Sequence, residues 1–205
     1  DAMQFLEAGR PALDDAERYL HDPEATYEDL VVRIERGKPR IEEAVAKAPG
    51  LALGHHLLGR AWELLGWEGK AEACWREAIR LDAKFAPAHF RLGLLLLDRG
   101  IATSEFRSER DDDAEMLRRA RALLAAAGME LDLASTLPVA AGEDVSQEVL
   151  LAARAYAADD RPSVRSLCDQ AIQRLGTRPG SERFNLLSAL VSTGEDRLRR
   201  LHQAL

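Results

Sequence analysis

The chain has 205 residues, of which 46% are hydrophobic, and this length and composition suffice for a core in one elongated or compact domain. Its net charge of -7 argues against a nucleic-acid ligand, because nucleic acids are bound by basic surfaces, and weakly against an anionic membrane. No apolar run approaches the roughly 20 residues of a membrane span, and abundant Ala, Leu, Glu and Arg without period-two strand patterns predict an all-α fold.

The two cysteines, Cys74 and Cys168, lie far apart in sequence, and neither belongs to a metal-type pair. We expect two buried thiols of a reduced, cytoplasmic protein. The chain begins at Asp1 without a methionine, a signal-peptide pattern or an apolar leader. We therefore expect it to be an excerpt of a longer protein.

Residues 1–25 are predicted to form an N-terminal arm and one helix. The first ten residues, 1–10, show no clear period, which is typical of an arm. Pro11 suits the first turn of a helix, where its missing N–H costs nothing, and Asp22-Pro23 should end that helix.

Residues 26–50 are predicted to form a degenerate helical hairpin. Thr26 and Asp29 are spaced as in a capping box, with Asp in the acidic place. The helix that they begin should end at Gly37, and Pro39 should open a second helix.

The clearest repeat lies in the next 50 residues. Leu58-Gly59 returns as Leu92-Gly93, 34 residues later, and 34 residues is the length of one tetratricopeptide repeat (TPR), a helix–turn–helix unit. Residues 52–85 resemble this family at the expected large, small and aromatic positions: Leu58, Gly59, Trp62, Gly66 in the turn, then Ala71, Trp75 and Ala78.

Each matching residue has a reason in packing. Gly59 is expected to let the paired helix approach closely, while Trp62 and Trp75 are expected to fill the space between helices. The proline with which the family usually ends a repeat is Ala83 here. The resemblance implies stacked helical hairpins, a TPR-like α-solenoid.

Residues 86–127 are predicted to form a second good repeat with an irregular insertion. The insertion is expected at residues 101–113, as a longer helix or a loop, because the next small residue at a repeat position, Ala114, comes nine residues late. A helix from Ala114 should stop at Gly128, and residues 129–144 are predicted to be an irregular connection.

Residues 145–205 are predicted to form two divergent repeats, which completes a single TPR-like helical domain over residues 1–205. Ser146 should cap one helix, Pro162-Ser163 should restart the chain, and Ser181 should cap a further helix. The apolar residues expected to pack in these helices are Leu150, Leu151, Tyr156, Val164, Cys168, Ala171, Phe184, Leu187 and Val191.

No catalytic motif and no cofactor site are predicted. His55-His56 with Cys74 and His89 suggest zinc only weakly, since ligand spacing is lacking, and packing roles are favoured. The acidic run of residues 109–113 is expected to be a solvated helix start rather than a cation site. Three tryptophans suggest an aromatic cage, but packing is favoured, with Trp67 as the one exposed ring.

The resemblance also implies that the first helix of each repeat lines a concave face. Carried over residue by residue, the candidate partner-binding residues are His56, Arg60, Glu63, Phe90 and Leu94. Such a face has few basic groups, which argues against a clamp for a terminal carboxylate. Its apolar part requires a cover, either a partner's helix or peptide or the chain's own later helices.

From these residues we expect a non-catalytic protein–protein interaction module that binds a peptide or helix of a partner in its groove. Self-association through the apolar face is a further expectation. The alternative is a regulatory or scaffolding segment of a larger bacterial signalling enzyme, such as a Ser/Thr protein kinase. An enzyme with its own catalytic site is the least favoured class, because no catalytic constellation is present in the sequence.

Overall fold

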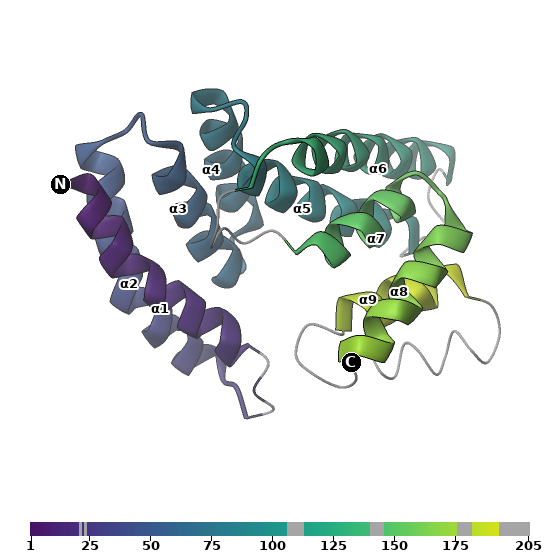
Figure 1. Ribbon diagram of the computed structural model, residues 1–205, viewed down its shortest axis with the longest axis horizontal. Helices are drawn as coiled ribbons and strands as arrows, with labels where there is room; N and C mark the ends of the chain where they lie inside the picture. The colour runs from purple at the N-terminus through teal and green to yellow at the C-terminus, as the bar shows by residue number, and fades with distance from the viewer. Residues whose placement is uncertain (21, 23, 106–112, 140–145, 176–181, 193–205) are drawn as a thin grey trace. The chain divides into compact units, whose positions relative to one another are not determined.

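The computed structural model of the chain describes residues 1–20, 22, 24–105, 113–139, 146–175 and 182–192. This part of the chain is helical and contains no strand, which confirms the all-α prediction (Figure 1). The helices are α1 (Ala2–Tyr19), α2 (Tyr27–Lys47), α3 (Ala52–Leu64), α4 (Glu68–Leu81), α5 (Ala86–Glu105), α6 (Asp113–Thr136), α7 (Gln147–Ala157), α8 (Arg161–Leu175) and α9 (Glu182–Val191). The chain divides into two compact units, Asp1–Ala88 and His89–Leu205, called here the N-terminal and the C-terminal unit.

In the N-terminal unit, α1 and α2 pack side by side (Figure 1). Leu6 and Leu13 on α1, and Ile34 and Ile41 on α2, are buried almost completely. Burial of one such side chain stabilises a fold by about 1.5–3 kcal/mol, so this pairing is a major source of the unit's stability. Helix α3 packs against both α1 and α2, and α4 packs against α3.

The backbones of α1 and α2 approach closely at two glycines. A Cβ atom on Gly37 would overlap the backbone oxygen of Gly9 and would lie 2.7 Å from the Cβ of Ala12. A Cβ atom on Gly9 would lie 2.8 Å from Cγ1 of Ile41. Neither glycine can therefore be replaced by a larger residue unless the two helices move apart.

The predicted helix boundaries in this unit are wrong in two places. Helix α1 begins at Ala2 and continues through Pro11, so residues 1–10 are not an arm. Helix α2 continues through Gly37 and Pro39, so no break divides it into a hairpin. A proline inside a helix costs about 3 kcal/mol, which the buried leucines and isoleucines on both sides of each proline offset.

Other local predictions for this unit are confirmed. The hydroxyl of Thr26 caps α2, because its oxygen accepts a hydrogen bond from the backbone N–H of Asp29 at 3.2 Å. Gly66 lies in the turn between α3 and α4 with a φ of 76°, a left-handed value that favours glycine. The ring of Trp75 lies against Gly59, where an added Cβ would be 2.5 Å from the indole nitrogen.

In the C-terminal unit, α5 and α6 contact each other through two glycines seven residues apart. A Cβ atom on Gly93 would lie 2.7 Å from Cγ of Leu131, and one on Gly100 would lie 2.8 Å from Cδ2 of Leu124. Helix α6 was predicted to stop at Gly128, but it continues to Thr136. The irregular connection predicted from residue 129 is therefore helical in its first part.

Helices α7, α8 and α9 complete the described part of the C-terminal unit. Ser146 caps α7 as predicted, because its hydroxyl oxygen accepts a hydrogen bond from the backbone N–H of Val149 at 3.4 Å. The predicted face of α8 is also confirmed, since Val164, Cys168 and Ala171 are buried. Helix α8 packs against α7 and α9. The insertion residues 106–112, the predicted cap Ser181 and residues 193–205, the end of the predicted divergent repeats, lie outside the described residues.

The close approach of α1 and α2 predicts a large difference between two Gly→Ala variants. Gly37→Ala should lower the free energy of unfolding by about 1–3 kcal/mol, because the new methyl group overlaps the backbone of α1. Gly69→Ala is the matched control: no atom lies within 4 Å of the new methyl group, and alanine favours helix by up to about 1 kcal/mol. Urea unfolding followed by circular dichroism measures both, and equal stabilities would contradict the close approach.

Candidate interaction site

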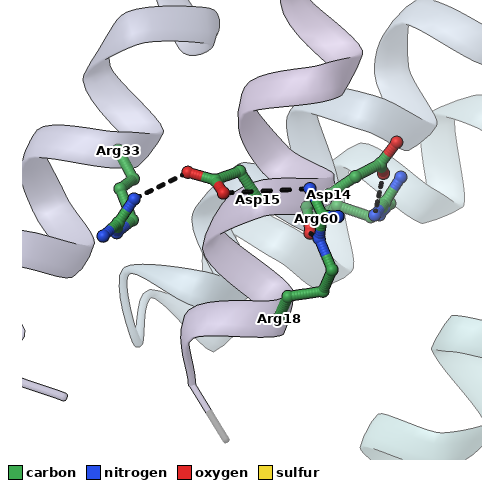
Figure 2. A network of polar contacts seen from close by, with 5 residues as sticks. All are labelled: Asp14, Asp15, Arg18, Arg33 and Arg60. Carbon is green, nitrogen blue, oxygen red and sulfur yellow. Dashed lines mark hydrogen bonds and ion pairs between the residues drawn. The ribbon is translucent and has the colours of Figure 1, made fainter. Parts of the chain in front are cut away.

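Arg60, one of the predicted partner-binding residues, lies inside the N-terminal unit. Its guanidinium group extends from α3 to α1, where it donates hydrogen bonds to Asp14 at 2.9 Å and to Glu17 at 3.1 Å. A second nitrogen–oxygen pair between Arg60 and Glu17 is 2.8 Å long. Only 1% of Arg60 is exposed to solvent. Figure 2 shows the contact between Arg60 and Asp14.

The charge of Arg60 is retained in spite of this burial. Burial alone would lower the pKa of Arg60, but the charge of Glu17 and the hydrogen bonds to Glu17 and Asp14 outweigh it, so the pKa lies above its ordinary value. A buried guanidinium group is stable only where carboxylates pair with it in good geometry. Arg60 therefore stabilises the packing of α3 against α1.

The neighbouring residue on α1 makes a similar contact with a different helix. Asp15 accepts a hydrogen bond from Arg33 of α2 at 2.8 Å and lies 3.8 Å from the guanidinium of Arg18 (Figure 2). Successive residues on a helix point about 100° apart, so Asp14 and Asp15 reach two different helices. This acidic pair thus connects α1 with both α2 and α3.

The remaining predicted partner-binding residues are also largely enclosed. His56 is buried, and its ring meets the ring of Phe85 edge-on, with centroids 5.4 Å apart. Glu63 is half-buried. Phe90 and Leu94, on α5, are both buried. Four of the five residues are therefore not on the surface of the chain, and their role in partner binding stays a prediction.

The histidines and the cysteine considered as a zinc set make separate contacts. His55 lies 2.9 Å from the backbone oxygen of Pro49, and Nδ1 of His89 lies 2.6 Å from a carboxylate oxygen of Glu130. Burial raises the pKa of the Cys74 thiol to about 11. Within the described ranges, no group of three His, Cys, Asp or Glu residues is arranged to hold a metal ion.

An open groove of about 560 Å³ lies between α7 and α8 of the C-terminal unit. Its lining combines three apolar and four polar side chains: Leu151, Leu167, Ala171, Glu148, Gln170, Gln173 and Arg174. Its volume falls in the range of roughly 300–1,000 Å³ that is typical of ligand-binding clefts. Helices α7 and α8, which form the groove, pack against each other, so the groove is part of one packed unit.

The polar lining of the groove is held in place by an ion pair. Arg174 of α8 donates a hydrogen bond to Glu148 of α7 at 2.7 Å. A hydrogen bond from its own backbone N–H, together with Ser146 and Arg174, lowers the pKa of Glu148 below its usual value. The groove therefore contains a carboxylate paired with a guanidinium group.

Leu151 lines the groove, although the sequence predicted that it packs inside the protein. It was expected on the apolar side of its helix, but 42% of its surface is exposed. The buried side of α7 is formed instead by Leu150, Ala152 and Ala153. No motif in the sequence marks the groove, because it arises where the side chains of two helices leave space between them.

Comparison of the chain with protein-family models, with curated proteins and with solved structures gives no match. The resemblance to tetratricopeptide repeats therefore depends on the residues and spacings of this sequence. In the part of the chain that the structure describes, no helix is both long enough and apolar enough to cross a membrane.

The buried ion pair predicts an asymmetry between its partners. The double variant Asp14→Ala/Glu17→Ala should lower the free energy of unfolding by about 3 kcal/mol, because it removes two carboxylates that pair with the buried guanidinium of Arg60. Arg60→Met should cost only about 1 kcal/mol, since the freed carboxylates are partly exposed and regain water.

Asp15→Ala serves as the control for this comparison. Its ion pair with Arg33 is partly exposed, and its loss should cost less than about 1 kcal/mol. Urea unfolding followed by circular dichroism measures the three variants. A double variant no less stable than Asp15→Ala would show that Arg60 is not held as described.

The raised pKa of Cys74 predicts slow alkylation. At about pH 8 its thiolate is scarce, so iodoacetamide should react roughly 100-fold more slowly than with a thiol of ordinary pKa. The rate should continue to rise about tenfold per pH unit until the pH nears 11. Mass spectrometry follows the reaction, with Cys74→Ser as the control for labelling of Cys168, and a plateau near pH 9 would contradict the shift.

Proposed function

We propose that the chain is a non-catalytic protein-interaction module, and that it binds a short peptide segment of a partner in the groove between α7 and α8. The observation that carries this proposal is the groove itself: about 560 Å³ of open space with apolar and polar side chains side by side. A cleft of this volume that combines apolar and polar side chains is typical of ligand-binding sites.

The chemistry of the lining indicates the kind of segment. Leu151 and Leu167 offer apolar surface to one or two aliphatic or aromatic anchors of a peptide. The amides of Gln170 and Gln173 can both donate to and accept from a peptide backbone. The charges of Glu148 and Arg174 offset each other, so we infer that a segment with apolar anchors is preferred over a strongly charged one.

We further propose that the helices form tetratricopeptide-like hairpins. Gly59 and Gly93 are 34 residues apart, and each receives a large side chain from the following helix, Trp75 in one case and Leu131 in the other. The two glycines thus hold equivalent positions of a 34-residue period, although their partners Trp75 and Leu131 are 56 residues apart. This equivalence supports the family proposal independently of the groove.

A peptide-display selection on the whole chain tests the proposed binding. Peptides that bind the wild-type protein should lose at least about tenfold in affinity with Leu151→Asp, because a carboxylate replaces apolar surface in the groove. Leu133→Asp is the matched control, since Leu133 on α6 is similarly exposed, at 45%, but does not line the groove. Isothermal titration calorimetry gives the affinities.

The selection also defines the result that would overturn the proposal. Peptides whose affinity falls equally with Leu133→Asp and Leu151→Asp would show binding elsewhere or a general loss of folding. Circular dichroism of both variants separates these two outcomes. A selection without any enriched peptide would contradict a peptide-binding function.

A further inference from the structure

The ammonium group of Lys70 contacts two tryptophan rings on the surface of the N-terminal unit. The ammonium nitrogen of Lys70 lies 4.1 Å from the ring centroid of Trp62 and 4.7 Å from that of Trp67. Both distances are well within the roughly 6 Å at which an aromatic face attracts a cation. One ammonium group is therefore held by two indole rings.

The cation and one of the rings are accessible from solvent. Trp67, the residue before α4, has 56% of its surface exposed, and Lys70 is exposed as well. Among the residues that the structure describes, Lys70 has its ring contacts and no carboxylate within ion-pair distance. The ammonium can thus leave the rings by rotation of its own flexible stem.

The surroundings of Trp62 favour positive charge. The ammonium of Lys38 also lies over this ring, at 4.6 Å, and is itself paired with Glu42 at 2.8 Å and with Glu35 at 3.7 Å. The chain as a whole carries a net charge of -7, which attracts cations and repels anions at long range. The ring of Trp62 is therefore contacted by two ammonium groups, and the charge of Lys38 is offset by Glu42 and Glu35.

We propose that Trp62 and Trp67 form a binding site for a trimethylammonium group, and that Lys70 occupies this site in the free chain. A trimethylammonium group is less strongly hydrated than the primary ammonium of Lys70, so it loses less on leaving water for the indole faces. Such a ligand displaces Lys70, whose ammonium returns to solvent. This site is independent of the groove between α7 and α8.

Two sources supply this chemistry, and two probes distinguish them. Choline represents a free small molecule, and a Gly-trimethyllysine-Gly peptide represents a methylated lysine of a partner protein. Both are titrated into the whole chain while the indole N–H signals are followed by NMR. The signals of Trp62 and Trp67 should shift, whereas that of the fully buried Trp75 should stay constant.

Removal of the Lys70 side chain, which occupies the site in the free chain, should strengthen the binding of both probes. Lys70→Ala should bind both probes at least about fivefold more tightly than the wild type, because the rings are no longer occupied. Lys84→Ala is the matched control, as it removes an exposed lysine outside these contacts and should bind like the wild type. Adding Trp67→Ala to Lys70→Ala should remove at least about fivefold of the affinity.

The wild-type protein provides a measurement that does not depend on any variant. The ε-methylene protons of Lys70 should be shifted upfield by the two rings, and should move downfield when either probe displaces the side chain. Tighter binding of the peptide than of choline would assign the site to a partner protein, and the reverse to a small molecule. The proposal would be overturned if the indole N–H signals of Trp62 and Trp67 did not shift. Equal gains in affinity from Lys84→Ala and Lys70→Ala would overturn it as well.

Discussion

Three helix pairs, α1 with α2, α3 with α4 and α5 with α6, contact each other at glycines, and the packing of their apolar residues depends on this close approach. Gly59 accommodates the ring of Trp75, and Gly93 accommodates Leu131. Between α1 and α2 the contact is closer still, because the backbones themselves meet at Gly37. A side chain in any of these places would separate the helices and expose the apolar residues that they bury.

This tight pairing also determines which residues are free to bind. Arg60 and His56 lie so far inside the N-terminal unit that they hold helices and loops together instead of facing solvent. Two of the accessible surfaces differ in kind: a mixed groove on α7 and α8, and indole rings near the turn between α3 and α4. The first is the proposed peptide site, and the second is the proposed site for a trimethylammonium group.

Local signals in the sequence predicted much of the fold, because caps and tight turns depend on a few neighbouring residues. Thr26, Ser146 and Gly66 acted as predicted. The same rules failed at Pro39 and Gly128, where tertiary packing extends a helix past a residue that normally ends it. Local sequence signals could not predict the candidate site. The burial of Arg60 and the groove between α7 and α8 both depend on contacts between different helices.

The central claim of this account is that a large side chain of one helix rests on a glycine of its paired helix, at Gly59 between α3 and α4 and at Gly93 between α5 and α6. Nuclear Overhauser effects in the folded chain test it directly. The α-protons of Gly59 should show contacts with the indole ring of Trp75, and those of Gly93 with the methyl groups of Leu131. If both sets of contacts are found, the glycine-based pairing is established; if either is absent while the chain is folded, the account is contradicted.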